Sequence, residues 1–354
     1  MQGITFDELT AQVERDAQAR QDFYVPTDSL RITTDKGNSH LATPAGDFSL
    51  RDTAHLHLAE LCGIDRRYYR RLRAHGPLLD ENVNYWLGAS GPKPRVIRAL
   101  DSSARAIVSD RYAALDNDGL LAAVSPLIDD IGGTIESCQI DEGNLTIKVV
   151  SPRLQGEVQK NDVVQFGYVL KNSEVRAGAL SVQPFVFRLV CLNGLIAGTG
   201  GLKSTRKHSG RNWHRDNEEF GLVPENVERK EWERSIWTQL QENVRAASND
   251  AAFQTLLERL RATTALHTTL EPEQVVERLG SLGAEFRLGP ELQSQIVQHL
   301  HADNYDGSLW NVVNGVTRTA QDVGSYNLAT SLEELGGRLS NLSPNSWERL
   351  VNVN

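Results

Sequence analysis

Residues 162–170, DVVQFGYVL, and residues 179–191, ALSVQPFVFRLVC, form the most strand-like part of the chain. Both are rich in β-branched and aromatic residues, and apolar side chains alternate with others over much of their length. Asn172, Ser173 and Gly178 lie between them and are typical of a turn or bulge. The two stretches therefore predict neighbouring strands of one sheet.

The same period of two occurs N-terminal to these strands. Four further stretches show it: RVIRAL, ARAIVS, TIESCQI and LTIKVV, which begin at residues 95, 104, 134 and 145. The DEGN segment at 141–144 suits a hairpin between the last two. A helical segment at 116–132 interrupts the strands. These patterns predict an α+β domain with a largely antiparallel sheet packed with helices.

The pattern changes to helical spacing after Asp216, where apolar residues recur four apart through residues 232, 236, 240 and 244. Residues 216–354 hold 11 Lys and Arg against 21 Asp and Glu, a net charge of −10, whereas the whole chain carries −9. We expect four parts: an N-terminal helix and hairpin (1–44), an α+β core domain (45–200), a basic loop (201–217) and an acidic helical C-terminal region (218–354).

Capping patterns mark two expected helix starts. Thr5 and Glu8 have the spacing of a capping box before the first helix. Ser49 and Asp52 have the same spacing before a second helix, for which Gly63 provides a C-terminal stop.

Several classes of function lack their sequence signatures. The start of the chain has no signal-peptide pattern, and no run approaches the ~18 apolar residues of a spanning helix, so we expect a cytoplasmic location and no membrane partner. The three cysteines form no CxxC pair, and His208, His214, Asp216 and Glu218 match no zinc-ligand spacing. Without a P-loop or a GxSxG elbow, we predict no catalytic residue, no metal and no cofactor.

The octapeptide RRYYRRLR at 66–73 is the sharpest charge feature of this acidic chain. On a helix its arginines cover one side, and Tyr68, Tyr69 and Leu72 cover the other, which we expect to pack inward. One interpretation is a solvated face, or one paired with acids such as those of the C-terminal part. The other is a surface for phosphates, which arginine forks bind bidentately, and it predicts nucleic-acid contacts from Arg66, Arg67, Arg70, Arg71 and Arg73.

A second basic cluster, KSTRKHSGRNWHR at 203–215, favours the second interpretation. Basic groups around an aromatic ring suit single-stranded nucleic acid, because charge follows the backbone while a base stacks on the ring. The alternative is a solvated loop whose tryptophan packs on the body of the protein. The residues expected to bind are Lys203, Arg206, Lys207, Arg211, Trp213 and Arg215.

Four phrases together resemble a known family. They are CGIDRRYYRRL, RAIVSDRYAALDNDGLL, LKNSEVRAGALSVQPFVFRLVCLNGL and LWNVVNGVTRTAQDV, which begin at residues 62, 105, 170 and 309. The chain resembles the phage/plasmid-like proteins grouped as domain of unknown function 932, over roughly residues 45–325. Gly315 stands where the family motif usually has Ala, and polar residues around Gln321 replace its usual histidine.

The residues within these motifs favour structural roles. We expect Asp116 to cap the next helix, and Glu174 to pair with Arg176 or Arg188. Asn193-Gly194 is a tight-turn signal. Trp310 and Asn314, four apart on one helix face, predict docking of that helix on the sheet domain.

The resemblance implies a mobile-element setting and a similarity to phage single-strand annealing proteins, which bind the DNA backbone as oligomers without ATP. We therefore expect a non-specific single-stranded DNA-binding protein of a phage or plasmid, which acts in recombination by annealing strands as a homo-oligomer in the host cytoplasm. The alternative is a protein-binding factor that modulates a host defence or replication component, with the basic face meeting an acidic partner. In either case the acidic C-terminal region is expected to dock a protein partner or to serve self-assembly. An enzyme of unknown type is the third hypothesis.

Overall fold

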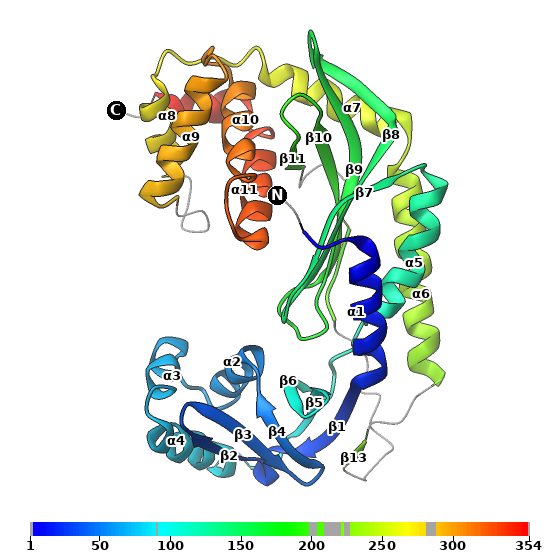
Figure 1. Cartoon of the computed structure of the whole chain (residues 1–354), viewed down its shortest axis with the longest axis vertical. Coiled ribbons are helices and arrows are strands. Elements are labelled where there is room, and N and C mark those ends of the chain that lie inside the picture. Colours follow the sequence, from blue (N-terminus) through cyan, green and yellow to red (C-terminus); the bar gives the residue numbers. More distant parts are fainter. Residues whose placement is uncertain are drawn as a thin grey trace.

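The computed structural model describes residues 3–89, 91–197, 204–208, 221–222, 227–280 and 288–352. It contains two β-sheets that follow one another along the long axis of the molecule (Figure 1). A small unit with its own helices lies at the lower end, and the C-terminal helices lie at the upper end. Both project from the same side of the second sheet, so the outline resembles the letter C.

The first sheet has the order β13-β1-β5-β6-β4-β3-β2, with the β4–β6 pair parallel. The boundary expected at residue 44 falls between β3 and β4, which are neighbours in this sheet. A short 3-10 turn, η1 (Thr27–Ser29), follows β1. The strands are β1 (Arg20–Pro26), β2 (Arg31–Asp35), β3 (Asn38–Thr43), β4 (Gly46–Leu50), β5 (Pro94–Leu100), β6 (Ser103–Ser109) and β13 (Gly221–Leu222).

Three helices pack on this sheet: α2 (Asp52–Leu61), α3 (Arg66–Leu72) and α4 (Gly76–Ala89). Helix α4 also protects the edge strand β2. The Ile32 N–H donates to Asn84 Oδ1 at 2.8 Å, the Asn84 amide donates back to the Ile32 carbonyl at 2.9 Å, and the Thr34 N–H donates to Asp80 at 2.8 Å. Side chains of α4 thus satisfy backbone groups that an open edge would leave available for pairing.

The second sheet is antiparallel, with the order β11-β10-β9-β8-β7 and β12 paired to β10. One face packs against α1 (Phe6–Ala19), α5 (Asn117–Asp130) and α6 (Val227–Ala247), which Figure 1 shows on its right. Alternate residues of the central strands, such as Ile147 and Phe166, are buried on that side. The strands are β7 (Thr134–Ile140), β8 (Leu145–Gln159), β9 (Asp162–Asn172), β10 (Leu180–Arg188), β11 (Asn193–Ile196) and β12 (Ser204–Arg206).

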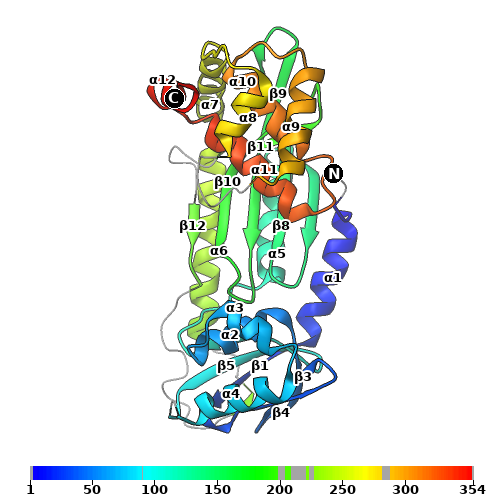
Figure 2. The same cartoon turned by 90° about the vertical axis from the view of Figure 1, so that its left-hand side faces the viewer.

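The remaining helices form the upper unit, which Figure 2 shows in front of the second sheet. They are α8 (Pro272–Leu279), α9 (Pro290–Ala302), α10 (Leu309–Thr319), α11 (Tyr326–Leu339) and α12 (Pro344–Val351), whereas α7 (Asp250–Thr263) packs on the other face of the sheet, where Phe253 contacts Phe166. Helix α11 meets β11 closely, because a Cβ at Gly337 would lie 1.8 Å from the Ile196 carbonyl oxygen. A buried ion pair, Lys148 to Glu333 at 2.7 Å, joins α11 to the middle of the sheet.

The α+β prediction and the helical C-terminal part are confirmed. The capping box of Thr5 and Glu8 is also present. Two local predictions are wrong. Ser49 does not cap α2 but lies in β4, where its hydroxyl bonds that of Ser103. Asn193 and Gly194 lie in β11, and the turn before this strand spans residues 189–192.

Candidate nucleic-acid interface

Helix α3 begins directly after α2 because Gly63 ends α2 and Asp65 caps the start of α3. Gly63 has a φ of 66°, a conformation that glycine adopts without strain, and α2 ends just before it. The Asp65 carboxylate then accepts hydrogen bonds from the N–H groups of Arg67 and Tyr68, each at 3.0 Å, and caps the new helix. These two residues set the direction in which the arginine-rich octapeptide leaves α2.

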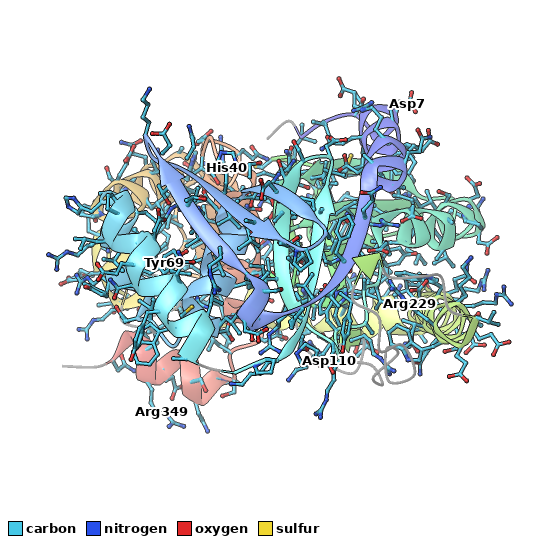
Figure 3. The ribbon with its side chains drawn as sticks, turned by 90° about the horizontal axis from the view of Figure 1, so that it is seen from below. Asp7, His40, Tyr69, Asp110, Arg229 and Arg349 are labelled. Atoms are coloured by element: carbon cyan, nitrogen blue, oxygen red, sulfur yellow. The ribbon has the colours of Figure 1, made fainter. Side chains whose placement is uncertain are left out.

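The inner side of α3 is formed by Tyr69 and Leu72, which are buried in the core of the lower unit. Seen from below, Tyr69 lies between the helices and strands of this unit (Figure 3). Its hydroxyl lies 3.0 Å from His55 Nδ1. The prediction that Tyr68 also packs inward is wrong, because its side chain is 48% exposed. A helix of only seven residues offers a narrow inner face, and Tyr68 falls outside it.

The outer side of α3 carries four exposed arginines: Arg66, Arg67, Arg70 and Arg71. Among the described residues, none of these four forms an ion pair. Arg73 differs, because its guanidinium lies 2.9 Å from the Asp52 carboxylate of α2. The described part of the C-terminal helices therefore supplies no acid to this face. Figure 1 shows α3 on the side of the lower unit that faces the upper unit.

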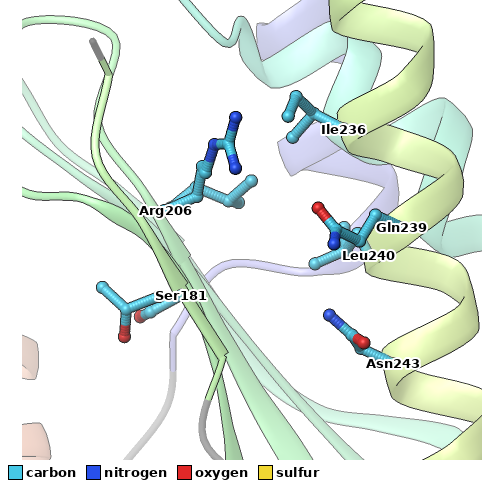
Figure 4. A pocket seen from close by; sticks show the side chains of 8 residues that line it. Ser181, Arg206, Ile236, Gln239, Leu240 and Asn243 are labelled. Carbon is cyan, nitrogen blue, oxygen red and sulfur yellow. The ribbon is translucent and has the colours of Figure 1, made fainter.

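The second predicted cluster is described only in part. Arg206 and Lys207 are exposed, whereas Lys203, Arg211, Trp213, Arg215 and His214 lie outside the described residues. Arg206 does not join the arginines of α3. It lines a pocket of about 180 Å³ between β10, β12 and α6, on the face of the second sheet that α6 covers (Figure 4). There its side chain faces Ile236 and the amide of Gln239.

The side chain of His208, which follows Arg206 and Lys207 in the sequence, is buried in the protein interior. Its ring stacks on Tyr112 with centroids 5.4 Å apart, and Nδ1 accepts from the Leu115 N–H at 3.3 Å. Burial, with the nearby Arg98 charge, lowers the pKa of His208 to about 4, so the ring is neutral at pH 7. Within the described ranges, no group of three or more His, Cys, Asp and Glu is placed to hold a metal.

The second and third family motifs meet in a buried network of charges where the two sheets join. The Arg98 guanidinium contacts Asp22 at 3.0 Å, Asp116 at 2.7 Å and the Glu174 carbonyl at 2.7 Å. Burial alone would raise the pKa of Asp116, but Arg98 and Arg20 hold it well below its ordinary range. Asp116 occupies the N-cap position of α5, yet its carboxylate bonds arginines and not the helix N–H groups.

The predicted partners of Glu174 are wrong. Glu174 pairs with Arg105 at 2.8 Å and Arg20 at 3.2 Å, and it accepts from the Asn117 N–H at 2.9 Å. Arg176 instead pairs with Glu60 of α2. Arg188 pairs with Asp162 at 2.5 Å. The acid in the NSEVRAG motif therefore holds the two sheets together from the inside.

The fourth motif docks α10 on the second sheet, as predicted. Trp310 Nε1 donates to Asp162 at 2.8 Å, and Asn193 donates to the Thr317 hydroxyl at 2.5 Å. The two departures from the family pattern have local reasons. A Cβ at Gly315 would lie 2.6 Å from the Leu300 side chain, and the Gln321 amide donates to the Cys191 carbonyl at 2.7 Å.

Two aromatic residues on α4 were missed by the sequence reasoning. Tyr85 and Trp86 are exposed, and their rings meet edge to face with centroids 5.1 Å apart. Their adjacency in the sequence was a signal of exposure. Side chains of neighbouring residues on a helix point about 100° apart, so one buried helix face rarely covers both. Neither ring belongs to the predicted site.

The described residues thus form a buried junction of charge pairs between the two sheets and an exposed basic helix outside it. A family model described as domain of unknown function (DUF932) matches residues 104–338, more than half of the 354-residue chain. The chain belongs to this family. The matched region contains Arg105, Asp116 and Glu174 of this network and the docking contacts of α10, whereas Arg20, Asp22, Arg98 and α3 precede it. No curated protein and no solved structure matches the chain.

The structure also bears on the expected partners. Within the described segments, no helix combines the length and apolar character needed to cross a membrane.

Proposed function

We propose that this protein binds the backbone of single-stranded DNA through the outer face of α3. The observation that carries the proposal is the set of four exposed arginines on one short helix, none of which has an ion-pair partner among the described residues. Like charges so close together repel one another, and a bound polyanion relieves that repulsion. Guanidinium groups match phosphate oxygens in pairs, which suits this face to a phosphate chain.

Tyr68 favours a single strand as the ligand. Its ring is exposed on the same helix at the border of the arginine face, and a base of a flexible strand can stack on it while the phosphates contact the arginines. Phosphate contacts carry little sequence information, so the binding is expected to be non-specific. Bases that are not held by the protein remain free to pair, and strand annealing in the recombination of a phage or plasmid is the role we propose for this binding.

The salt dependence gives the proposal a magnitude. Each phosphate contact on a single strand contributes about −0.7 to the slope of log K against log salt, so four contacts contribute about −2.8. The affinity should then fall about 50-fold between about 50 mM and about 200 mM salt. A variant that keeps two contacts should lose only about 7-fold over that interval.

The test is fluorescence anisotropy with a labelled oligonucleotide and the variant Arg66→Glu/Arg70→Glu. Its matched control is Arg15→Glu/Arg234→Glu, which changes the net charge equally through exposed arginines of α1 and α6. We expect the α3 variant to lose binding at about 50 mM salt and the control to retain it. Both should melt like the wild type, because surface charge changes cost less than ~0.5 kcal/mol.

Three results would contradict the proposal. The wild type could fail to bind any oligonucleotide at low salt, which would favour an acidic protein as the partner of α3. Both variants could lose binding equally, which would assign the effect to net charge. The α3 variant could unfold more easily and still bind, which would show that these arginines serve the protein's own fold.

A further inference from the structure

The exposed apolar side chains of this protein gather in two places. Among the described residues, ten large hydrophobic side chains are exposed. Five lie on the helices of the lower unit, three lie in the turn between β10 and β11, and only Val227 and Leu328 lie elsewhere. Scattered apolar residues are normal on a protein surface, but two separate concentrations indicate contact sites.

The first concentration, the turn patch, consists of Leu189, Val190 and Leu192. Val190 and Leu192 are 57% and 63% exposed, and Leu192 has a φ of 53°, a strained conformation for a leucine. The turn is held firmly from below. The Leu189 N–H donates to the Val163 carbonyl at 2.9 Å, and the Gln321 amide donates to the Cys191 carbonyl. Its apolar side chains are therefore presented on a rigid support.

The second concentration, the α4 patch, consists of Leu78, Tyr85 and Trp86. At about 100° per residue the three lie on one side of α4. Tyr85 is 65% exposed, and its contact with Trp86 fixes both rings. Fixed aromatic rings lose little conformational entropy on binding and are frequent at the centres of protein interfaces.

The two patches lie toward opposite ends of the molecule. Figures 1 and 2 place α4 at the lower end and the upper ends of β10 and β11 in the other half. One chain therefore cannot bring its own patches together, but two copies can. Charge favours the same pairing. The turn patch is hydrogen-bonded to Gln321 of the C-terminal part, whose residues 216–354 carry a net charge of −10, while the α4 patch follows the arginines of α3.

We infer that this protein self-associates head to tail, with the turn patch of one copy packed on the α4 patch of the next. Such a contact uses two different surfaces, so each added copy leaves one patch of each kind open unless the assembly closes on itself. The charges act mainly at a distance, as steering that salt screens, and the apolar contact supplies the affinity. This inference does not rest on the proposed DNA binding.

The test uses light scattering after size exclusion, over a range of protein concentrations. The turn variant is Val190→Asp/Leu192→Asp, and the α4 variant is Tyr85→Asp/Trp86→Asp. We expect the wild-type mass to rise with concentration beyond that of a dimer, and each variant to remain a monomer. An equimolar mixture of the two variants should form a dimer and stop there, because only one intact pair of patches is available to each two copies.

The control variant is Val227→Asp/Leu328→Asp, which adds the same charges at the two exposed apolar residues outside both patches. It should associate like the wild type. Circular dichroism melts establish that each variant is folded, and Tyr85→Ser replaces the α4 variant if that one unfolds. A monomeric wild type at every concentration would overturn the inference. So would an α4 variant that still associates, since this would indicate a contact between identical surfaces. If a monomeric variant still binds an oligonucleotide, DNA binding does not depend on self-association, and the two proposals can be judged independently.

Discussion

Arg98 is predicted to be one of the most costly single side chains to remove from this protein. It is 2% exposed and donates to two carboxylates, Asp22 and Asp116, and to a backbone carbonyl. Arg98→Met keeps much of the volume but leaves both carboxylates without their central cation. Breaking a buried ion pair from one side costs about 3–5 kcal/mol, so we expect a loss of that size in the free energy of unfolding.

The matched control is Arg245→Met. Arg245 also pairs with an aspartate, Asp130, at 2.9 Å, but both side chains of this pair are about half exposed. An exposed pair of this kind contributes about 0.2–1 kcal/mol. Urea unfolding of both variants at pH 7, with equal slopes against denaturant, gives the comparison.

Two outcomes decide the matter. Equal losses for Arg98→Met and Arg245→Met would refute the argument that burial makes this network costly to break. Adding Asp116→Asn to Arg98→Met provides a second check, because it removes one of the two carboxylates that have lost Arg98 as a partner. The double variant should lose less free energy of unfolding than the sum of the two single variants.

Three further predictions concern single sites. Burial lowers the pKa of His57 to about 4, and its Nδ1 accepts a hydrogen bond from the Ile107 N–H at 3.2 Å. In the unfolded chain the pKa of this histidine is about 6.5, so between pH 6.5 and pH 4 the unfolded chain binds a proton that the folded protein does not. Stability should fall from pH 7 to pH 5, and His57→Gln should lose less over that interval in urea titrations. Leu192→Gly should raise the melting temperature slightly, because glycine relieves a strain of about 1 kcal/mol; a marked decrease would contradict this. Gly315→Ala should cost about 1–2 kcal/mol through crowding of Leu300, and Leu300→Val beside it should restore part of the loss.

The strands of the second sheet and the hairpin at 141–144 could be predicted because their signals are local. Alternation and turn residues report on neighbours within about ten positions. The same holds for the capping box at Thr5. The prediction at Ser49 failed because its hydroxyl has a partner far along the chain, Ser103, that competes with the helix N–H groups.

The internal network could not be predicted because its charges come from distant parts of the chain. Arg20 and Glu174 are separated by 154 positions, and Arg98 and Glu174 by 76. Proximity in the sequence predicts Arg176 or Arg188 as the partner of Glu174, whereas the fold brings in Arg20 and Arg105. The exposed face of α3 could be predicted, since a run of arginines with only Asp65 nearby has no local acid to pair with.

The position of β1 in its sheet means that one of its two neighbouring strands is synthesised long after it. This strand is among the first made, yet one of its neighbours, β13, ends at residue 222. The segment before it also awaits a distant partner, because the Ile4 N–H donates to the Cys138 carbonyl at 3.0 Å. At about 5–20 residues per second, roughly 10–40 s pass between the emergence of β1 and that of β13. During this interval β1 can pair with β5 only, so its other edge stays open in the nascent chain and is available for pairing with another chain.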